Sequence, residues 1–299
     1  MKLAAKNMIS RMANGPAWPL FRMARGMERR LDSLCTYAER QRRAEARSDL
    51  KTAILADTFP DLRVTAGPFA GMRYPDAAAT GSALLPKLAG SYESELAEFI
   101  EIARSRDYGL ILDIGCAEGF YAVGLARLFP DARVLAYDVD AGARAMCRRM
   151  AEANDVADRV DIQGFCDTAR LKELAGAPRA LLFADCEGFE AELFTAETAP
   201  ALAGHDIIIE CHDFKDPTIT PGIVAAFSAS HDVTFARARS ELAKAQDPDL
   251  PAIRGYNAET RRFIVSEARN PGQFWLFLSS KSAAAADAAP VVAAVGAQG

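Results

Sequence analysis

The stretch LILDIGCAEGFYAVGLA, residues 110–126, sets two glycines and two acids between an apolar run and a second apolar segment. The first part predicts a buried strand and the last part a helix. Gly115 and Gly119 would let the backbone turn tightly and let a ligand approach without a Cβ in between. A helix N-terminus adds free N–H groups that attract an anionic part of a ligand. The stretch therefore predicts a ligand-binding corner at the carboxyl end of a strand.

The spacing of this corner disfavours two common nucleotide loops. The dinucleotide pattern G-x-G-x-x-G fails because position 117 is Ala, and no Gly-Lys-Ser/Thr follows as in a P-loop. What matches is D-x-G-x-x-x-G from Asp113, with a second acid, Asp138, nineteen residues beyond Gly119. A carboxylate there can accept two hydrogen bonds from a ribose diol. An adenosine ribose without a pyrophosphate fits this pattern, and S-adenosyl-L-methionine is the obvious ligand.

Four stretches together resemble an S-adenosylmethionine-dependent methyltransferase, and more narrowly the FkbM family: LDIGCAEGFYAVGLA, VLAYDVD, LLFADCEGFEAELF and IIIECHD. DCEGFE at 185–190 resembles the family's D-x-E-G-x-E block after the fourth strand. ECHD resembles the E-x-H ending of the fifth strand. The resemblance covers roughly residues 90–280. One departure is Ala117, where such enzymes often carry a third glycine.

The resemblance implies a set of residues in contact with the cofactor: Asp113, Gly115, Cys116, Ala117, Gly119, Asp138, Val139, Asp167 and Asp185. Asp113 would hold the loop or the methionine amino group, and the loop from Gly115 to Gly119 would pass under the cofactor. Asp138 would bind the ribose, Val139 would pack on the adenine, and Asp167 would meet its amino edge. Asp185 is expected near the methionine end.

Methyl transfer to a hydroxyl is the predicted reaction, and a base near the acceptor would help to remove its proton. We expect His212 to be this base because an imidazole has an unperturbed pKa of about 6.5. Glu210 would orient the ring, and Glu187 would hold the acceptor hydroxyl. The competing interpretations are that Asp185 and Glu187 cap a helix, and that the enzyme works by positioning alone.

A metal is not expected from the sequence. The six cysteines are Cys35, Cys116, Cys147, Cys166, Cys186 and Cys211, without a C-x-x-C pair. They suit reduced thiols in a cytoplasm, and those at strand ends are interpreted as small apolar fillers. His205 and His231 lie in polar contexts and are predicted to be solvated.

The sequence around these motifs predicts strands and helices that alternate along the chain. Strands are expected at Leu110–Ile114, Arg133–Tyr137, Val160–Gln163, Ala180–Ala184, Ile207–Glu210, Val233–Ala236 and Phe274–Leu278, with helices at about 120–128, 141–153, 168–175 and 189–196. Short apolar strands separated by helices predict a mostly parallel α/β sheet covered on both faces, the Rossmann-like doubly wound class. The resemblance implies seven strands in the order 3-2-1-4-5-7-6, with the seventh antiparallel.

Three parts of the chain are expected: a basic, helical extension at 1–60, the Rossmann-like unit at 61–282, and a disordered Ala-rich tail at 283–299. Helices are predicted at 31–57 and near 92–105, with a small hairpin at 62–76. The segment 238–272 is predicted to be an insertion over one end of the sheet. It would contact a polar acceptor through Arg254, Tyr256, Arg261 and Arg262, form a dimer contact, or be solvated.

Charge is unevenly distributed. The net charge is −5, but residues 1–30 carry +6, which leaves −11 on the rest. An acidic body disfavours broad nucleic-acid binding. The segment 1–30 has no continuous apolar core of a signal peptide. It is either a poorly ordered tail or a peripheral contact with an anionic membrane or a partner.

The acceptor is expected to be a small molecule, such as a secondary metabolite, or a glycan. Two rival functions are a catalytically inactive cofactor-binding scaffold and a nicotinamide-dependent oxidoreductase. Intact Asp113, Asp138 and DCEGFE argue against the first. The failed G-x-G-x-x-G and the absence of a recognisable Tyr/Lys or Cys/His set argue against the second.

Overall fold

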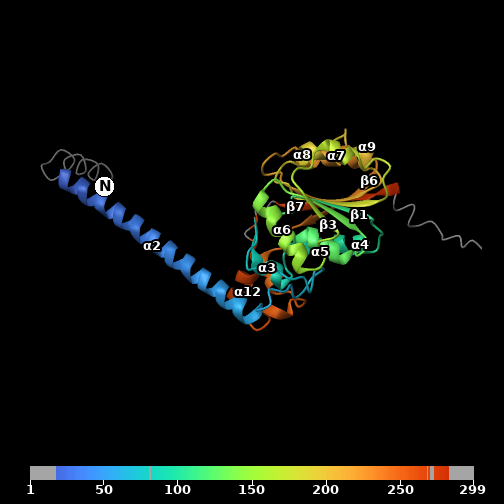
Figure 1. Ribbon diagram of the computed structural model, residues 1–299. Helices are drawn as coiled ribbons and strands as arrows, with labels where there is room; N and C mark the ends of the chain where they lie inside the picture. Colours follow the sequence, from blue (N-terminus) through green and yellow to red (C-terminus); the bar gives the residue numbers. More distant parts are fainter. Residues whose placement is uncertain (1–17, 81, 268, 270–272, 283–299) are drawn as a thin grey trace, which may run out of the picture. The chain divides into compact units, whose positions relative to one another are not determined.

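The computed structural model describes residues 18–80, 82–267, 269 and 273–282. The chain divides into two compact units between Asp57 and Thr58. Helix α2, Trp18–Thr58, forms the described part of the first unit (Figure 1) and contains the helix predicted at 31–57. Residues 1–17 of the basic segment and the whole tail at 283–299 lie outside the described residues, and so do the side chains of residues 18–30.

The second unit is built on one sheet of seven strands. Its strands are β1 Leu110–Ile114, β2 Arg133–Tyr137, β3 Val160–Gln163, β4 Ala180–Ala184, β5 Asp206–Cys211, β6 His231–Arg237 and β7 Phe274–Ser280. The order is β3-β2-β1-β4-β5-β7-β6. Strand β7 is antiparallel to both of its neighbours, whereas the pairs among β1–β5 are parallel. The predicted fold class and strand order are therefore confirmed.

Helices cover both faces of the sheet, as Figure 1 shows with α4, α5 and α6 on one side and α7, α8 and α9 on the other. The helices of this unit are α3 Leu84–Ala89, η1 Ser94–Leu96, α4 Ala97–Arg104, α5 Phe120–Leu128, α6 Ala141–Ala153, α7 Thr168–Lys172, α8 Glu190–Leu193, α9 Ala199–Leu202, α10 Ile219–Phe227, α11 Glu241–Ala245, η2 Pro251–Ile253 and α12 Ala258–Val265. The central strands β4 and β5 are buried along their whole length. Two covered faces explain why these strands read as continuous apolar runs.

Alternation along the strands divides the core between the two faces. Leu112, Leu182 and Ile209 belong to one packed cluster with residues of α7 to α10. Ile111 and Phe183 are also buried but point to the opposite face, because successive side chains of a strand alternate. The edge strand β6 is half-exposed instead. The core thus holds the carboxyl ends of β1 to β5 at one common edge.

Several local expectations need comment. The segment 62–76 folds back as predicted, with one antiparallel bridge between Arg63 and Arg73. Helix α10 was not predicted, since its Gly and Pro residues lower helix propensity. The segment 238–272 carries α11, η2 and α12 and buries apolar side chains such as Ile253 and Ile264. The interpretation of this segment as a solvated loop is therefore wrong.

The prediction that His205 and His231 are solvated is also wrong, because both are buried. His205 Nδ1 accepts a hydrogen bond from the backbone N–H of Ala180 at 3.0 Å. His231 Nε2 lies 2.9 Å from the carbonyl oxygen of His205. Burial lowers the pKa of both rings. Both rings form hydrogen bonds with backbone groups at the amino end of the sheet, which is the end opposite to the predicted ligand site.

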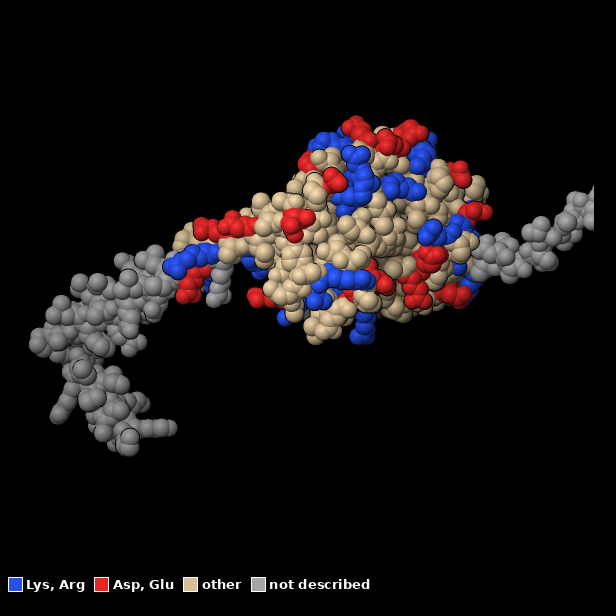
Figure 2. All heavy atoms as spheres, turned by 90° about the horizontal axis from the view of Figure 1, so that it is seen from below, with Lys and Arg blue, Asp and Glu red and all other residues tan. Residues whose placement is uncertain are grey.

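No described helix is long and apolar enough to cross a membrane. On the face that Figure 2 shows, Lys and Arg side chains are interspersed with Asp and Glu and do not gather into one basic patch. The charges on that face therefore do not indicate a binding site for an anionic or a cationic partner.

Candidate active site

A cavity of about 450 Å³ opens at the carboxyl edge of the sheet. Its wall is built from the residues that follow β1, β2, β3 and β4, together with Thr80, Ser82, Lys87 and Tyr92 from the segment before β1. Strand β1 lies between β2 and β4, where the strand order reverses. Such a switch point is where open α/β sheets bind ligands, and the volume suits a small-molecule site.

The glycines of the β1–α5 loop are required by the protein itself. Gly115 has φ +90°, and a Cβ there would lie 1.7 Å from the carbonyl oxygen of Asp185. Gly119 has φ +95°, and its Cβ would lie 2.8 Å from Cys147 Sγ. From the sequence, both glycines were attributed to a tight turn and to the approach of a ligand. The structure gives another reason, since the loop packs against β4's end and against α6.

Ala117 occupies the position where a third glycine is common. Its φ is +47°, in the left-handed region that glycine adopts more easily than alanine. Ala117 lies in the cavity wall. Glu187, on the opposite loop after β4, also has a positive φ of +58° and lines the cavity. Backbone held in this region at two wall positions is typical of a functional site.

Asp138 joins the loop to the end of β2. Its Oδ2 accepts a hydrogen bond from the backbone N–H of Ala117 at 2.9 Å, and its Oδ1 accepts one from Asp140 at 2.8 Å. A carboxylate has about four acceptor positions, so two remain for a ribose diol. Asp140 caps α6 by accepting a hydrogen bond from the backbone N–H of Ala143 at 2.7 Å. Asp138 therefore lies in the cavity wall with acceptor capacity left over.

Two apolar side chains of the wall are exposed. Val139 is 76% exposed and Phe165 is 59% exposed, and both line the cavity. Exposed apolar surface in a concave site is typical of ligand binding. Phe165 was not singled out from the sequence. Asp167, expected at the adenine amino edge, instead caps α7 through the backbone N–H of Arg170 at 2.9 Å, and the described wall residues do not include it.

Asp113 lies beneath the loop and not in the wall. It is 1% exposed, and its Oδ2 has no hydrogen-bond partner among the described residues. Burial raises the pKa of Asp113 to about 8, against the effect of a hydrogen bond with the backbone of Ala122. Two roles were expected for Asp113. Its buried position beneath the loop agrees better with support of the loop than with direct contact with the methionine amino group.

A buried ion pair fixes the loop to the segment before β1. Glu118 pairs with Lys87, and the two side chains are 2% and 3% exposed. Glu118 also accepts hydrogen bonds from Tyr74 Oη at 3.2 Å and from the backbone N–H of Thr80 at 3.1 Å. Lys87 lines the cavity. Sequence reasoning missed this pair, although Glu118 between the two glycines was the available signal.

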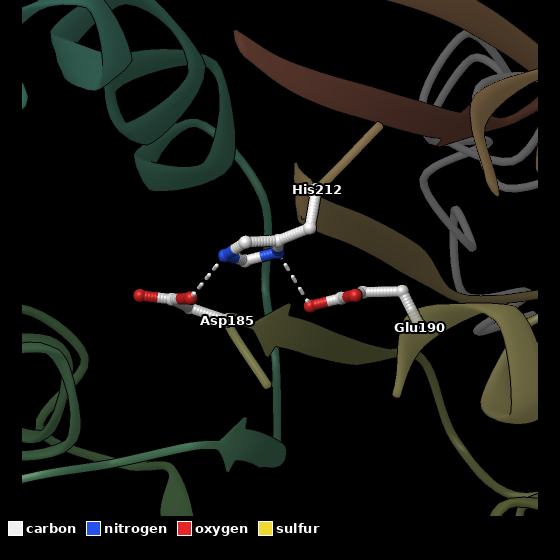
Figure 3. A group of neighbouring side chains, drawn as sticks. All are labelled: Asp185, Glu190 and His212. Atoms are coloured by element: carbon white, nitrogen blue, oxygen red, sulfur yellow. Dashed lines mark hydrogen bonds and ion pairs between the residues drawn. The ribbon is translucent and has the colours of Figure 1, made fainter. Parts of the chain in front are cut away.

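The acidic corner consists of Asp185, Glu187, Glu190, Glu210 and His212, which come from the ends of β4 and β5 and the start of α8. Figure 3 shows the imidazole between two of these carboxylates. His212 Nδ1 lies 3.0 Å from Glu190 Oε1. His212 Nε2 lies 3.7 Å from Asp185 Oδ1, 3.7 Å from Glu187 Oε2 and 3.6 Å from Glu210 Oε2.

The structure brings these predicted residues together but gives them partly different surroundings. Asp185 and Glu187 line the cavity, and neither caps α8, which has no side-chain cap. His212 is fully buried, and the described wall of the cavity does not include it. Glu190, and not Glu210, makes the hydrogen bond that orients the ring. The role of His212 as the base stays a prediction.

Electrostatics in the corner follow from burial. Burial raises the pKa of Glu210 to about 11, with further increase from the charge of Asp185. Burial also raises the pKa of Asp185. Burial alone would lower the pKa of His212, but the hydrogen bond and charge of Glu190 outweigh it and raise that pKa. Arg269, which sequence reasoning missed, pairs with Glu210.

The remaining candidates lie elsewhere. Cys116 and Cys186 line the cavity. A hydrogen bond with Cys147, together with burial, raises the pKa of Cys116, and burial raises that of Cys186, which supports their interpretation as neutral fillers. The proposed acceptor contacts of the insertion are not among the described wall residues. Arg254 donates to the carbonyl of Pro248, Arg261 donates to that of Tyr256 at 2.8 Å, and Arg262 lies 3.8 Å from Glu241. Tyr256 lies 2.5 Å from Thr58 Oγ1 through its hydroxyl.

Fold and site together define a Rossmann-like, doubly wound α/β unit with a cavity at its topological switch point. No protein-family model matches the chain. A release factor glutamine methyltransferase of Chlorobaculum tepidum is 38% identical over 79 residues, which is 26% of this chain and 27% of the relative. The chain thus matches about a quarter of the length of this curated relative.

The solved structures that resemble this chain are more distant in sequence. A putative O-methyltransferase from Klebsiella pneumoniae is 15% identical, with a TM-score of 0.43, over 64% of this chain and 81% of that one. The O-methyltransferase TomG from Streptomyces achromogenes, in complex with SAM, is 17% identical, with a TM-score of 0.41, over 69% and 83%.

Proposed function

We propose that this protein is an S-adenosylmethionine-dependent methyltransferase that methylates a hydroxyl oxygen of a small molecule, such as a secondary metabolite, or of a glycan. The observation that carries this proposal is the cavity at the β1/β4 switch point, with the Asp138 carboxylate in its wall. The short similarity to a methyltransferase and the four FkbM-like motifs support the same activity.

The cofactor would be held by the loops after β1, β2 and β3. Asp138 has acceptor positions left for a ribose diol. Val139 and Phe165 offer exposed apolar surface to a planar base. The turn from Gly115 to Gly119 carries the backbone under the ligand and into α5. These groups fit an adenosine without a pyrophosphate.

In this reaction no protein side chain has to form a covalent bond with the substrate. The bound cofactor supplies a methyl group on a sulfonium, which leaves as a neutral thioether when the new oxygen–carbon bond forms. The chain must align the acceptor hydroxyl with that methyl group and exclude competing water. It must also receive the hydroxyl proton as the bond forms.

The acidic corner is where we propose that the acceptor hydroxyl binds. Asp185 and Glu187 both face the cavity. Glu187 is oriented by Lys215, whose Nζ donates to the Glu187 carbonyl oxygen at 2.9 Å and pairs with the Glu187 carboxylate. A hydroxyl held by Glu187 would lie beside Asp185, with His212 behind them. An inactive scaffold that only binds the cofactor would not require these acidic side chains, so their presence favours an enzyme.

Calorimetry of the full chain tests the cofactor. S-adenosylhomocysteine should bind and NAD should not, because the loop lacks the dinucleotide pattern. Binding of NAD with no binding of S-adenosylhomocysteine would overturn the proposal in favour of an oxidoreductase. For the scaffold alternative, transfer of labelled methyl groups to a panel of hydroxyl acceptors is compared between the natural protein and a Glu187→Ala variant. Cofactor binding with no transfer to any acceptor would favour the scaffold.

A further inference from the structure

His212 presents its two ring nitrogens to different surroundings. Nδ1 lies 3.0 Å from Glu190 Oε1, and that oxygen also accepts the backbone N–H of Cys186 at 2.9 Å. A carboxylate fixed in this way favours a proton on Nδ1, and in the neutral ring this leaves the lone pair on Nε2. The same pairing of a carboxylate with the far nitrogen orients histidines that bind metals. Figure 3 shows this arrangement.

Nε2 is buried and has no hydrogen-bond partner in the described part of the chain. Its nearest polar neighbours are the carboxylate oxygens of Asp185, Glu187 and Glu210, at 3.7, 3.7 and 3.6 Å. These separations exceed the 2.7–3.2 Å or so of an N–H···O hydrogen bond. Two ligands about 2.0–2.2 Å from one zinc-sized cation lie roughly 3.3–3.6 Å apart at tetrahedral angles. The spacing around Nε2 is close to that of a coordination sphere.

The clustered acidic side chains around His212 also favour binding of a cation. Ligand atoms of Asp185, Glu190 and His212 lie within 4.8 Å of one another, and so do those of Glu93, Asp185 and Glu210. The two groups share Asp185. Arg269 compensates Glu93, at 2.9 Å, and Glu210. Asp185 Oδ1 is buried and without a hydrogen-bond partner among the described residues. Asp185 also shares a hydrogen bond with Glu210, whose pKa is raised by burial and by the charge of Asp185. Crowded carboxyl groups of this kind either share a proton or bind a cation, and a bound metal would take the place of the shared proton.

We propose that His212 Nε2 and the carboxylates of Asp185 and Glu210 bind one divalent cation at the edge of the cavity. Glu190 is a positioning residue, since it holds the imidazole through Nδ1. One imidazole and two carboxylates suit Mn²⁺, Fe²⁺ or Zn²⁺ better than a cation that takes oxygen ligands alone. Sequence reasoning found no metal set because the donors come from separate motifs, DCEGFE and ECHD, that meet only across β4 and β5.

The cation would also deepen the mechanism. Asp185 lines the cavity, so an acceptor hydroxyl at this wall could complete the coordination sphere and lose its proton more readily. That role rests on the proposed function, whereas binding of the cation does not. The two ideas can therefore fail separately.

The test is a Mn²⁺ titration of the full chain after treatment with a chelator, followed by electron paramagnetic resonance of the free ion. Saturation at one Mn²⁺ per chain is expected. His212→Ala and Glu210→Gln should each weaken binding at least about tenfold, a typical cost for disturbing a metal site. Glu192→Gln is the matched control, because Glu192 lies exposed on the same helix as Glu190. Circular dichroism melting checks that each variant folds.

The outcomes are distinct. No binding of Mn²⁺ or of Zn²⁺ up to about 1 mM, an affinity of roughly 4 kcal/mol, would overturn the metal site. Unchanged affinity in folded His212→Ala and Glu210→Gln would do the same. Calorimetry with S-adenosylhomocysteine on the same samples reports on the proposed function alone. If it binds while Mn²⁺ does not, the methyltransferase proposal stands without the cation.

Discussion

Substitution of Gly115 by Ala tests the geometry on which the whole cavity depends. Gly115 has φ +90°, and an alanine Cβ would lie 1.7 Å from the carbonyl oxygen of Asp185, where a normal contact needs more than 3 Å. That oxygen belongs to backbone, so it cannot swing away as a flexible side chain could. The loop after β1 and the loop after β4 must therefore move apart in the variant.

The expected magnitude has two parts. The left-handed conformation costs alanine about 1–2 kcal/mol, and forcing an extra methyl group into packed structure costs about 1–3 kcal/mol. Together these terms predict a loss of about 2–5 kcal/mol. A domain of this size loses about 2–4 °C in Tm per kcal/mol, so the melting temperature should fall by about 4–20 °C.

Thermal melting and calorimetry with S-adenosylhomocysteine measure the two consequences. Gly109→Ala is the control, since Gly109 precedes the same strand, has no positive φ, and a Cβ there meets no atom within 4 Å. Gly109→Ala should melt and bind like the natural protein, whereas Gly115→Ala should also bind at least about tenfold more weakly, a change of about 1.4 kcal/mol. If Gly115→Ala melts within about 2 °C of Gly109→Ala, the described contact between the loops is wrong.

Three other predictions follow from neighbouring contacts. Asp138→Ala should reduce affinity for S-adenosylhomocysteine at least about tenfold because two charged hydrogen bonds are lost, whereas Asp140→Ala, which removes only the cap of α6, should leave calorimetric affinity unchanged. Lys87→Met should lower the free energy of unfolding in urea by about 3–5 kcal/mol because it strands a buried carboxylate. Adding Glu118→Gln should recover at least half of that loss, and an additive double variant would refute the pairing. Burial holds the pKa of Asp113 at about 8, above the value of about 3.9 of an unfolded chain. The folded state therefore binds more protons from pH 4 to 8, and stability should fall as pH rises through that range. The stability curve of Asp113→Asn should be flatter, and parallel curves for the two proteins would contradict the raised pKa.

Much of the sheet could be predicted because its signals are local. The strands at 110–114, 133–137, 160–163 and 180–184 coincide with the predicted bounds, since each is a short apolar run between turn residues. The corner at Gly115 and Gly119 was equally visible, because positive φ favours glycine wherever it occurs. The reason for these glycines, however, came from Asp185 and Cys147, which lie far away in the sequence.

Burial and partners were decided by the tertiary structure. His205 and His231 stand in polar sequence contexts, yet packing buries them against backbone groups of distant segments. Asp167 reads as a ligand group, but in the structure it caps the helix that it precedes. A single sequence does not specify whether a polar side chain caps a helix or binds a ligand, because the same residue types serve both purposes.

The sequence by itself determined the order of strands and helices and the motifs at the strand ends, because these depend on hydrophobic period and on turn chemistry within a few residues. Only the tertiary structure decided how separate motifs combine. Parallel pairing of β4 with β5 brings Asp185 beside His212, and Arg269 joins them from a segment without any recognisable motif. Side chains that are tens of residues apart meet through strand register and packing, and neither is encoded in local spacing.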